Sequence, residues 1–123
     1  MDKINILSKY KKFEAIWSPH CIAELNDQQV LLAKINGEFV WHSHKDEDEL
    51  FYVIKGKLNM EYRDKTVEVL PGEMIVVPKG VEHRPSAKIE TWILLFEPPA
   101  NCLLYTYYAA DEDDTVDLGG RLI

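Results

Sequence analysis

Residues 37–56 of this chain read GEFVWHSHKDEDELFYVIKG. Alternate side chains of a β-strand share one face, so a strand through this region points His42 and His44 in the same direction. Two imidazoles fixed in this way suit a borderline divalent metal. Glu49 opens the next apolar run, and a hairpin can return its carboxylate to the two histidines. The stretch therefore predicts a metal site.

A second stretch, residues 72–83, reads GEMIVVPKGVEH and supplies a further candidate ligand. Its apolar run is typical of a strand, and the Pro78-Lys79-Gly80 sequence that follows is typical of a tight turn. His83 comes shortly after this turn, near the far end of the β-rich part of the chain. We expect the turn to bring His83 to the same site as a fourth ligand.

The sequence around these stretches predicts an all-β domain. Turn-type or charged clusters such as Asn36-Gly37 and Pro71-Gly72 separate short β-rich runs, and no run resembles a crossover helix, so we expect an antiparallel sandwich or barrel. Before them, apolar residues at helical intervals predict a short helix within residues 4–17, which Ser18-Pro19 ends. The expected strands are Gln29–Ile35, Glu38–Ser43, Leu50–Ile54, Leu58–Tyr62, Thr66–Val69, Met74–Val77 and Thr91–Phe96.

The two stretches together resemble the two sequence motifs of the cupin family. In the first motif, H-x-H is followed by Glu and, after six more residues, by Gly; the second runs Gly, five residues, Pro-x-Gly, two residues and His. Two departures are that four rather than five residues separate Gly37 from His42, and that Ala87 stands where the second motif often ends in Asn. The resemblance covers residues 31–98 and implies a double-stranded β-helix (jelly-roll) barrel. It also implies that one divalent ion of zinc, iron, nickel, manganese or copper is held by His42, His44, Glu49 and His83.

Several polar residues near these motifs compete with the expected ligands. Glu47 can share the strand parity of Glu49, yet only Glu49 has the six-residue spacing to Gly56. Asp46 and Asp48 are expected in a solvated turn, and His20 is expected to be an ordinary surface or half-buried histidine. Three charged residues near His83 are expected either at the rim of the pocket or in solvent, namely Lys79, Glu82 and Arg84.

The chain has 123 residues, which is enough for one domain with a sizeable core. We divide it into an N-terminal helix and lead-in strand (residues 1–28), a barrel core (29–98) and a C-terminal extension (99–123) with an acidic tail at Asp111–Asp114. The two cysteines, Cys21 and Cys102, lack the C-x-x-C spacing of metal or redox pairs. We expect both to be free thiols in a reducing compartment.

Charge and hydropathy argue against several classes of partner. Fourteen Lys and Arg against 21 Asp and Glu give a formal charge of -7, which repels nucleic acid and anionic lipid surfaces. No run approaches the ~18 apolar residues of a membrane span, and no leader sequence is visible, so we expect a cytoplasmic protein that does not bind membranes. A segment as apolar as Ile93–Phe96 suits a buried face between two copies, so we expect a homodimer.

The expected ligand set limits the chemistry without selecting a reaction. Three neutral imidazoles and one carboxylate leave a divalent ion with a net charge of about +1 and open positions for water or a substrate oxygen. The leading hypothesis is a non-redox enzyme of isomerase, lyase or ring-opening type, acting on a small polar or anionic metabolite such as a sugar acid, with no general base assigned. The alternatives are an iron- or nickel-dependent dioxygenase and a non-catalytic small-molecule binding or sensing module, and a metal-free structural cupin also remains open.

Overall fold

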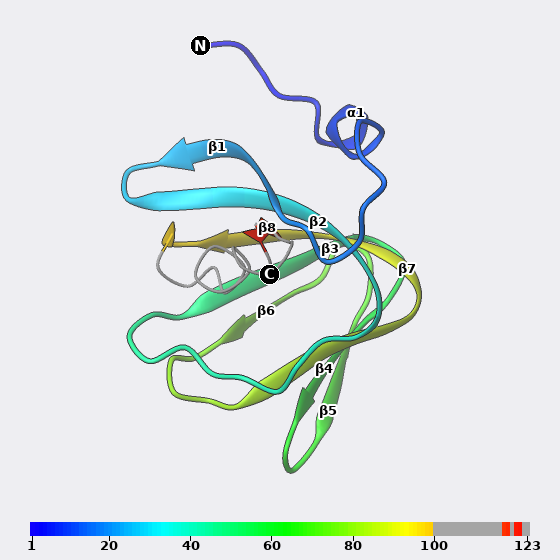
Figure 1. Ribbon diagram of the computed structural model, residues 1–123, viewed down its shortest axis with the longest axis vertical. Coiled ribbons are helices and arrows are strands. Elements are labelled where there is room, and N and C mark those ends of the chain that lie inside the picture. Colours follow the sequence, from blue (N-terminus) through cyan, green and yellow to red (C-terminus); the bar gives the residue numbers. More distant parts are fainter. Residues whose placement is uncertain (100–116, 119, 122–123) are drawn as a thin grey trace.

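Short apolar runs separated by turns form an antiparallel sheet that rolls into a barrel, with the N-terminal helix on its outside (Figure 1). The computed structural model describes residues 1–99 and the backbone of residues 117–118 and 120–121. Cys102 and the acidic tail Asp111–Asp114 lie outside the described residues. The elements are α1 (Ile6–Tyr10), β1 (His20–Leu25), β2 (Gln28–Glu38), β3 (Glu49–Lys55), β4 (Leu58–Tyr62), β5 (Thr66–Val69), β6 (Met74–Val77), β7 (His83–Glu97), β8 (Asp117–Leu118) and β9 (Gly120–Arg121).

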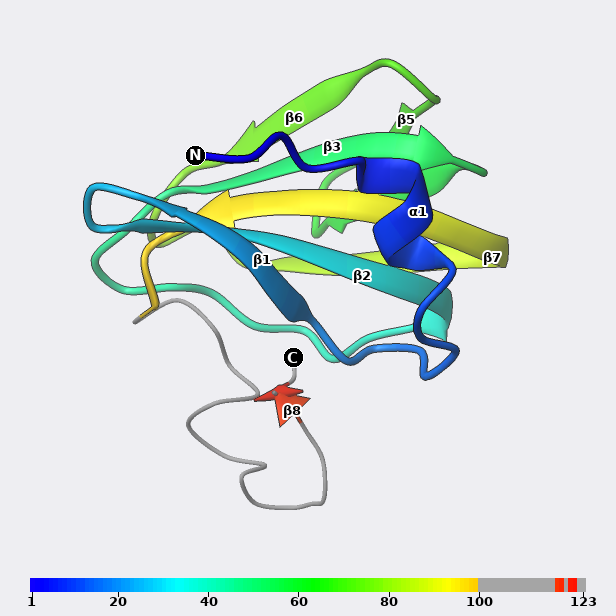
Figure 2. The ribbon, with the colours of Figure 1, turned by 90° about the horizontal axis from the view of Figure 1, so that it is seen from above.

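Strand β7 connects the two parts of the barrel. It is 15 residues long and pairs with β2 along most of its length, with β3 through its second half and with β4 through its first residues. Figure 2 shows β1, β2, β7, β3 and β6 side by side, in the order of their hydrogen bonding, while β4 pairs with β5 beside the start of β7. Every pairing among these seven strands is antiparallel, as predicted for an all-β jelly roll.

The inside of the barrel is apolar because inward and outward side chains alternate along the strands. On β3 and on the second half of β7, buried positions alternate with half-buried ones. Each of these inward rows ends in a carboxylate, Glu49 on β3 and Glu97 on β7. The buried hydrophobic core consists of Leu31, Ala33, Ile35, Phe51, Val53, Leu58, Met60, Val69, Val77, Ala87, Ile93 and Leu95.

The prediction of a strand over Glu38–Ser43 is wrong, although the segment still lies beside β7. β2 ends at Glu38, and among residues 39–44 the sheet-like pairing is a single bridge between His42 and His83. The register shifts by one residue between successive backbone bonds, which interrupts the regular ladder. Irregular pairing therefore holds His42 against the first residue of β7 and His44 against Gly80, just before β7. The bonds run from Phe39 N to Pro85 O, from His42 N to His83 O, from His83 N to His42 O and from Gly80 N to His44 O.

The Asn36-Gly37 pair was predicted as a turn but lies within β2. The register between β2 and β7 shifts between Ile35 and Gly37. Gly37 has a φ of 88°, a backbone conformation that glycine adopts without steric cost. The pair therefore forms a β-bulge, which bends the strand instead of reversing it.

The short N-terminal helix is confirmed, but it is shorter than the range in which it was predicted. Helix α1 begins after Asn5, whose side chain accepts a hydrogen bond from a backbone N–H of the first turn. Beyond the helix the chain is bound to the sheet, because Lys34 Nζ donates to Phe13 O at 2.7 Å and Ile16 pairs with Lys34. These tertiary contacts override the helical period of the sequence. With five residues, α1 is too short to cross a membrane, and no longer helix occurs in the part of the chain that the structure describes.

Candidate metal centre

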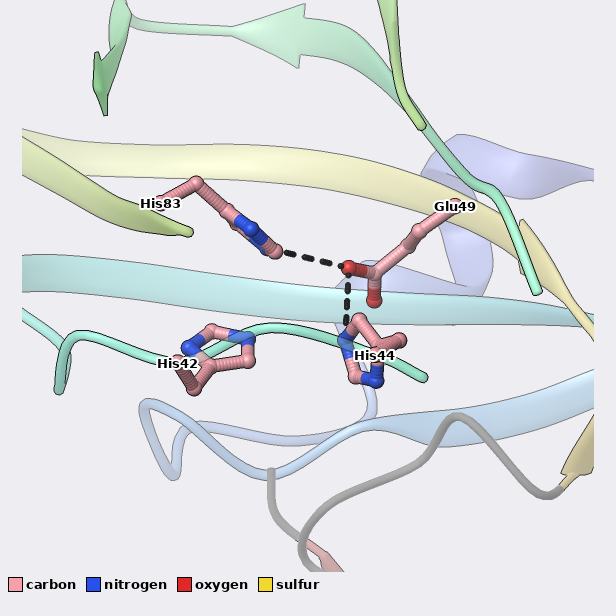
Figure 3. A group of neighbouring side chains, drawn as sticks. All are labelled: His42, His44, Glu49 and His83. Carbon is pink, nitrogen blue, oxygen red and sulfur yellow. Dashed lines mark ion pairs between the residues drawn. The ribbon is translucent and has the colours of Figure 1, made fainter. Parts of the chain in front are cut away.

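Four polar side chains from three segments meet between the strands of the barrel (Figure 3). His42 and His44 come from the segment after β2, Glu49 is the first residue of β3, and His83 is the first residue of β7. Each residue offers one nitrogen or carboxylate oxygen, and these atoms all lie within 4.8 Å of one another. The structure therefore brings together all four ligands predicted from the sequence.

The carboxylate of Glu49 lies between two of the imidazoles. Its Oε1 atom is 3.1 Å from His44 Nε2 and 3.5 Å from His83 Nε2, and Figure 3 marks both contacts. Glu49 is 5% exposed and His83 is fully buried, while His42 remains partly exposed. Three members of the cluster, His44, Glu49 and His83, are thus buried, and His42 is accessible to solvent in part.

Two of the histidines are oriented by backbone carbonyls. Nδ1 of His42 lies 2.9 Å from the carbonyl oxygen of Val40, and Nδ1 of His83 lies 2.9 Å from that of Val81. A carbonyl oxygen can only accept, so in each neutral ring Nδ1 carries the proton and donates it. Nε2 then presents its lone pair to the centre of the cluster, which is the tautomer that a metal ligand requires.

Buried polar atoms test whether a cation fits the cluster. Within residues 1–99, His44 Nε2, Glu49 Oε1 and His83 Nε2 are buried and contact one another, but none of the three makes a hydrogen bond. Such atoms are costly unless something pairs with all of them. Zinc binds imidazole nitrogen at about 2.1 Å, so the ligand atoms of a tetrahedral ion lie about 3.4 Å apart. The four atoms of the cluster lie within 4.8 Å of one another, so the most distant pair needs to close by up to about 1.4 Å. The donor set fits a divalent metal.

The ionisation of the cluster also suits metal binding. Burial, together with the neighbouring His83, lowers the pKa of His42 to about 4, so its ring is neutral at pH 7. Burial alone would raise the pKa of Glu49, but the contacts with His44 and His83 and a hydrogen bond from Glu97 outweigh it and hold that pKa well below its ordinary value. A neutral imidazole and an ionised carboxylate are the forms that bind metals.

Three of the four side chains line a cavity of about 50 Å³. Among the residues that the structure describes, its remaining wall is aromatic and aliphatic apart from Glu97. Four of the lining residues are partly exposed and mark the mouth, namely Trp17, Pro19, Phe39 and His42. The buried lining consists of Ala33, Ile35, His44, Glu49, Phe51, Pro85, Ile93, Leu95 and Glu97.

Glu97 and Trp17 are among the cavity residues that the reasoning from sequence did not identify. Glu97 is 2% exposed, and the register that pairs Leu50 with Phe96 places it beside Glu49 on the neighbouring strand. Its signal was available, because continuing the alternation of β7 past Phe96 gives Glu97 the inward parity. Trp17 belongs to the segment predicted as helix, and no local pattern indicates that it reaches the cavity.

The competing polar residues lie elsewhere. Glu47 is exposed and is not a member of the cluster. Glu82 forms an ion pair with Arg63 at 2.9 Å and Arg84 one with Glu61 at 2.7 Å, so these residues are paired on the surface and do not line the cavity. Lys79 is exposed and also does not line the cavity. His20 is half-buried, as expected, and stacks on the ring of Phe13.

Residues 30–91 match the family model described as the cupin domain, and this match spans both predicted motifs. The chain is a cupin. The departures noted at Gly37 and Ala87 therefore do not remove it from the family. None of the four clustered residues is altered by either departure.

Relatives of this cupin occur in several bacteria. YdbB from Bacillus subtilis (strain 168) is 42% identical over 77 residues, which cover 62% of this chain and 68% of YdbB. A crystal structure of a cupin-2 domain containing protein from Shewanella frigidimarina is 50% identical with a TM-score of 0.77, covering 77% of this chain and 93% of that one. Protein NMB1881 from Neisseria meningitidis is 28% identical with a TM-score of 0.73, covering 79% and 99%. These likenesses cover between 62% and 79% of this chain.

Proposed function

We propose that this cupin binds one divalent metal ion through His42, His44, Glu49 and His83 and uses it in a non-redox reaction on a small metabolite. One observation carries the proposal: three buried donor atoms without hydrogen-bond partners in the described residues face a common point at the edge of an apolar cavity. Isomerisation, ring opening and elimination all need an electrophile beside a carbonyl or hydroxyl oxygen. A divalent cation in such a site polarises a carbonyl or lowers the pKa of bound water.

The residues of the chain supply the surroundings for this chemistry. The Nδ1 hydrogen bonds of His42 and His83 fix their rings, and the apolar walls limit water around the site. Glu97 is the polar side chain of the described lining that is not a proposed ligand. We assign no general base, because no titratable group is placed against a defined substrate.

The sequence led us to expect a small polar or anionic substrate such as a sugar acid, and the lining of the cavity supports part of this expectation. A sugar acid has an oxygen-bearing end that can reach the cluster, as this proposal requires. Among the described residues, however, the lining contains no Lys or Arg and only Glu97 to pair with further hydroxyl groups. The lining therefore favours the oxygen-bearing head of such a molecule over its hydroxylated remainder.

An iron- or nickel-dependent dioxygenase is the second candidate. The observation that favours it is the apolar wall formed by residues such as Phe39, Phe51 and Leu95, which suits an apolar substrate and dioxygen. The same ligands can hold a redox-active metal. Dependence of turnover on oxygen separates this candidate from the first.

We also propose that the protein acts as a homodimer. The outward face of the sheet carries two apolar rows across neighbouring strands, Val76-Leu50-Phe96 and Met74-Tyr52-Leu94. The N-terminal segment covers the other end of this face, where Tyr10 stacks on Trp92. On β6, at the edge of the sheet, Met74 is 59% exposed and Val76 is 45% exposed. Exposed apolar groups on an edge strand favour contact with a second copy.

The proposed metal site is tested by replacing His44 with Ala. We expect elemental analysis to find about one ion per chain in the unmodified protein and a loss of more than about fivefold in the variant, because one of four ligands is missing. His20→Ala is the matched control, since His20 stacks on Phe13 outside the cluster. A His44→Ala protein that is folded and retains its metal would contradict the assignment.

The reaction class is tested with the metal-loaded protein and a mixture of small metabolites, with and without oxygen. Consumption that is independent of oxygen supports the non-redox enzyme, and consumption that requires oxygen supports the dioxygenase. Retention of a metabolite without turnover supports a binding or sensing module. The His44→Ala variant is the negative control in each arm.

A further inference from the structure

The cavity has two chemically different parts, one lined by the proposed metal ligands and the other lined mainly by apolar side chains. Nine of its thirteen described lining residues are apolar, and His42, His44 and Glu49 are already assigned to the metal. Glu97 is the one further polar side chain in the described lining, and it lies beside Glu49 on the neighbouring strand. Any part of a ligand that extends past the metal therefore meets carbon atoms almost everywhere.

Two aromatic rings stand at the mouth of this cavity. The rings of Trp17 and Phe39 stack with their centroids 5.1 Å apart and their planes 19° from parallel. Phe39 in turn meets the ring of His42 edge-on, with the centroids 5.4 Å apart. The aromatic surface is thus continuous with one of the proposed ligands, and a group bound to the metal can extend directly along it.

The backbone around Trp17 is constrained in a way that fixes the indole at the mouth. Its φ is 56°, in the left-handed region that residues with large side chains rarely occupy. Trp17 N donates to Lys34 O at 2.8 Å, and the indole Nε1 donates to Asn36 O at 2.9 Å. The polar atom of the side chain is therefore already paired, which leaves the ring carbons for a ligand. Strained backbone of this kind persists where the surrounding structure holds it, and it clusters at binding sites.

The size of the cavity divides a ligand into two parts. Its volume of about 50 Å³ is well below the roughly 150 Å³ of a protein cavity known to enclose a benzene ring. Only a few atoms of a ligand can therefore lie within it beside the metal. The remainder has to lie at the mouth, against Trp17 and Phe39.

We infer that the ligand of this site has a small oxygen-bearing head, which reaches the metal, and an uncharged apolar tail, which stacks at the mouth on Trp17 and Phe39. This inference rests on the proposed function and specifies its substrate class. An anionic tail would be desolvated with no Lys or Arg from the described lining to pair with it. A polyhydroxylated tail would lose water without gaining equivalent hydrogen bonds.

The same geometry assigns Trp17 as a specificity-determining residue. Trp17 and Pro19 precede residue 30, where the match to the cupin domain begins, so this side of the mouth is supplied by the N-terminal segment of this chain. The tail of the ligand is thus selected in part by a segment that precedes the residues matched by the cupin-domain model. A change at Trp17 should alter ligand choice while leaving the metal in place.

Three hydroxamic acids with the same metal-binding head test the inference. Acetohydroxamic acid has almost no tail, benzohydroxamic acid carries an aromatic ring, and succinic monohydroxamic acid carries a carboxylate. We expect the metal-loaded wild-type protein to bind the benzo compound about tenfold more tightly than the other two, because only its tail gains from the aromatic mouth. Isothermal titration calorimetry with each compound gives the three affinities.

Two variants assign the effect to the mouth. In Trp17→Ala the preference for benzohydroxamic acid should fall to about twofold or less, with metal content unchanged. Trp41→Ala is the matched control, because Trp41 makes cation–π contacts with Arg63 and Arg84 and does not line the cavity. If Trp17→Ala does not fold, Phe39→Leu takes its place, and the wild-type comparison of the three tails still decides the main point.

The outcomes separate the inference from the proposal on which it depends. If the protein takes up no metal, or if acetohydroxamic acid does not bind the metal-loaded form, the proposed function fails. If all three compounds bind equally, the metal site stands and the apolar-tail inference is overturned. A preference that survives in Trp17→Ala removes Trp17 from its assigned role.

Discussion

At the residue scale, the same kind of hydrogen bond orients the rings of His42 and His83. Each ring donates from Nδ1 to the carbonyl oxygen two residues earlier in its own segment, at 2.9 Å in both cases. The backbones of the two residues are also hydrogen-bonded to each other in both directions. The Nδ1 bonds set the orientation of each ring, and the backbone bonds between His42 and His83 set the distance between the rings. Because both are fixed before a metal binds, binding costs less conformational entropy.

Glu97 provides a prediction at this scale, because it lies beside Glu49 on the neighbouring strand and its side chain contributes to the lowered pKa of Glu49. In Glu97→Gln the amide can still donate to the Glu49 carboxylate, so we expect metal affinity within about threefold of wild type. In Glu97→Ala the donor is lost, and affinity should fall about 10- to 100-fold, as is usual when a partner of a metal ligand is removed. Competition with a chromogenic chelator measures both values. Equal affinities in the two variants would show that Glu97 does not position Glu49.

His42 provides a second prediction, on the pH dependence of stability in the metal-free protein. Its pKa is about 4 in the folded state against an ordinary value of 6.5. Between these pH values the unfolded chain binds more protons, so the free energy of unfolding should fall on acidification from about pH 6.5 to about pH 4, by at most about 3 kcal/mol. Glu49 acts in the same direction at lower pH, since its pKa is also lowered on folding.

Urea unfolding of the chelator-treated protein at pH 7 and pH 4.5 measures this effect. His42→Gln is the control, because glutamine does not titrate, and its loss of stability should be smaller than that of the wild type. A wild-type protein that is equally stable at both pH values would contradict the prediction. A loss of the same size in His42→Gln would assign the effect to other groups.

At the element scale, the tight connection between β3 and β4 packs against the middle of β7. Gly56 has a φ of 94°, and a Cβ atom built on it would lie 2.4 Å from Thr91 Oγ1 and 2.8 Å from Thr91 Cα. Lys57 N donates to the same Thr91 hydroxyl at 3.1 Å. The last glycine of the first cupin motif is therefore required by the close approach of two strands, independently of the metal.

Gly56→Ala should accordingly destabilise the protein strongly. We expect a loss of about 2–4 kcal/mol in the free energy of unfolding, from the left-handed backbone together with the clash against Thr91. Gly72→Ala is the matched control, because Gly72 also has a positive φ, of 85°, but nothing lies within 4 Å of its Cβ position. That variant should lose only about 1–2 kcal/mol. Equal losses in denaturant unfolding would show that the contact with Thr91 does not matter.

At the scale of the whole molecule, the barrel has an outward face that its own chain covers only in part. Lys34 is buried at 7% exposure, with its ammonium group over the rings of Phe13 and Trp92. The N-terminal segment therefore shields the outward side chains near β2 from solvent, whereas those of Met74 and Val76 on β6 remain exposed. The distribution of exposed apolar groups therefore places the proposed dimer contact at the β3 and β6 end.

A double substitution tests this placement. Met74→Lys combined with Val76→Lys should convert a dimer into a monomer of 14.3 kDa, because two charges would have to be buried at the interface. Ile89→Lys is the control, since Ile89 is 60% exposed on β7, away from these two rows. Light scattering coupled to size-exclusion chromatography measures the mass. A wild-type monomer, or a double variant that stays dimeric, would exclude this interface.

Residue types and spacing by themselves determined most of the architecture and the members of the cluster. Strands β4, β5 and β6 begin and end where the alternation of side chains predicts, because the period of a strand is a local property. Likewise, H-x-H, the following Glu49 and the turn before His83 are local patterns, and the structure brings these residues together as predicted. Whether they hold a metal, and which one, stays a prediction.

Only the tertiary structure decided the shape of the cavity and the ends of several elements. Glu97 lies beside Glu49 because of the register between β3 and β7, and Trp17 lies at the mouth because it is bonded to Lys34 and Asn36 on β2. The helix stops early for the same reason, since contacts with the sheet outweigh its weak local preference. Contacts between segments distant along the chain set these features, and the local alternation of β7 indicates only that Glu97 faces inward.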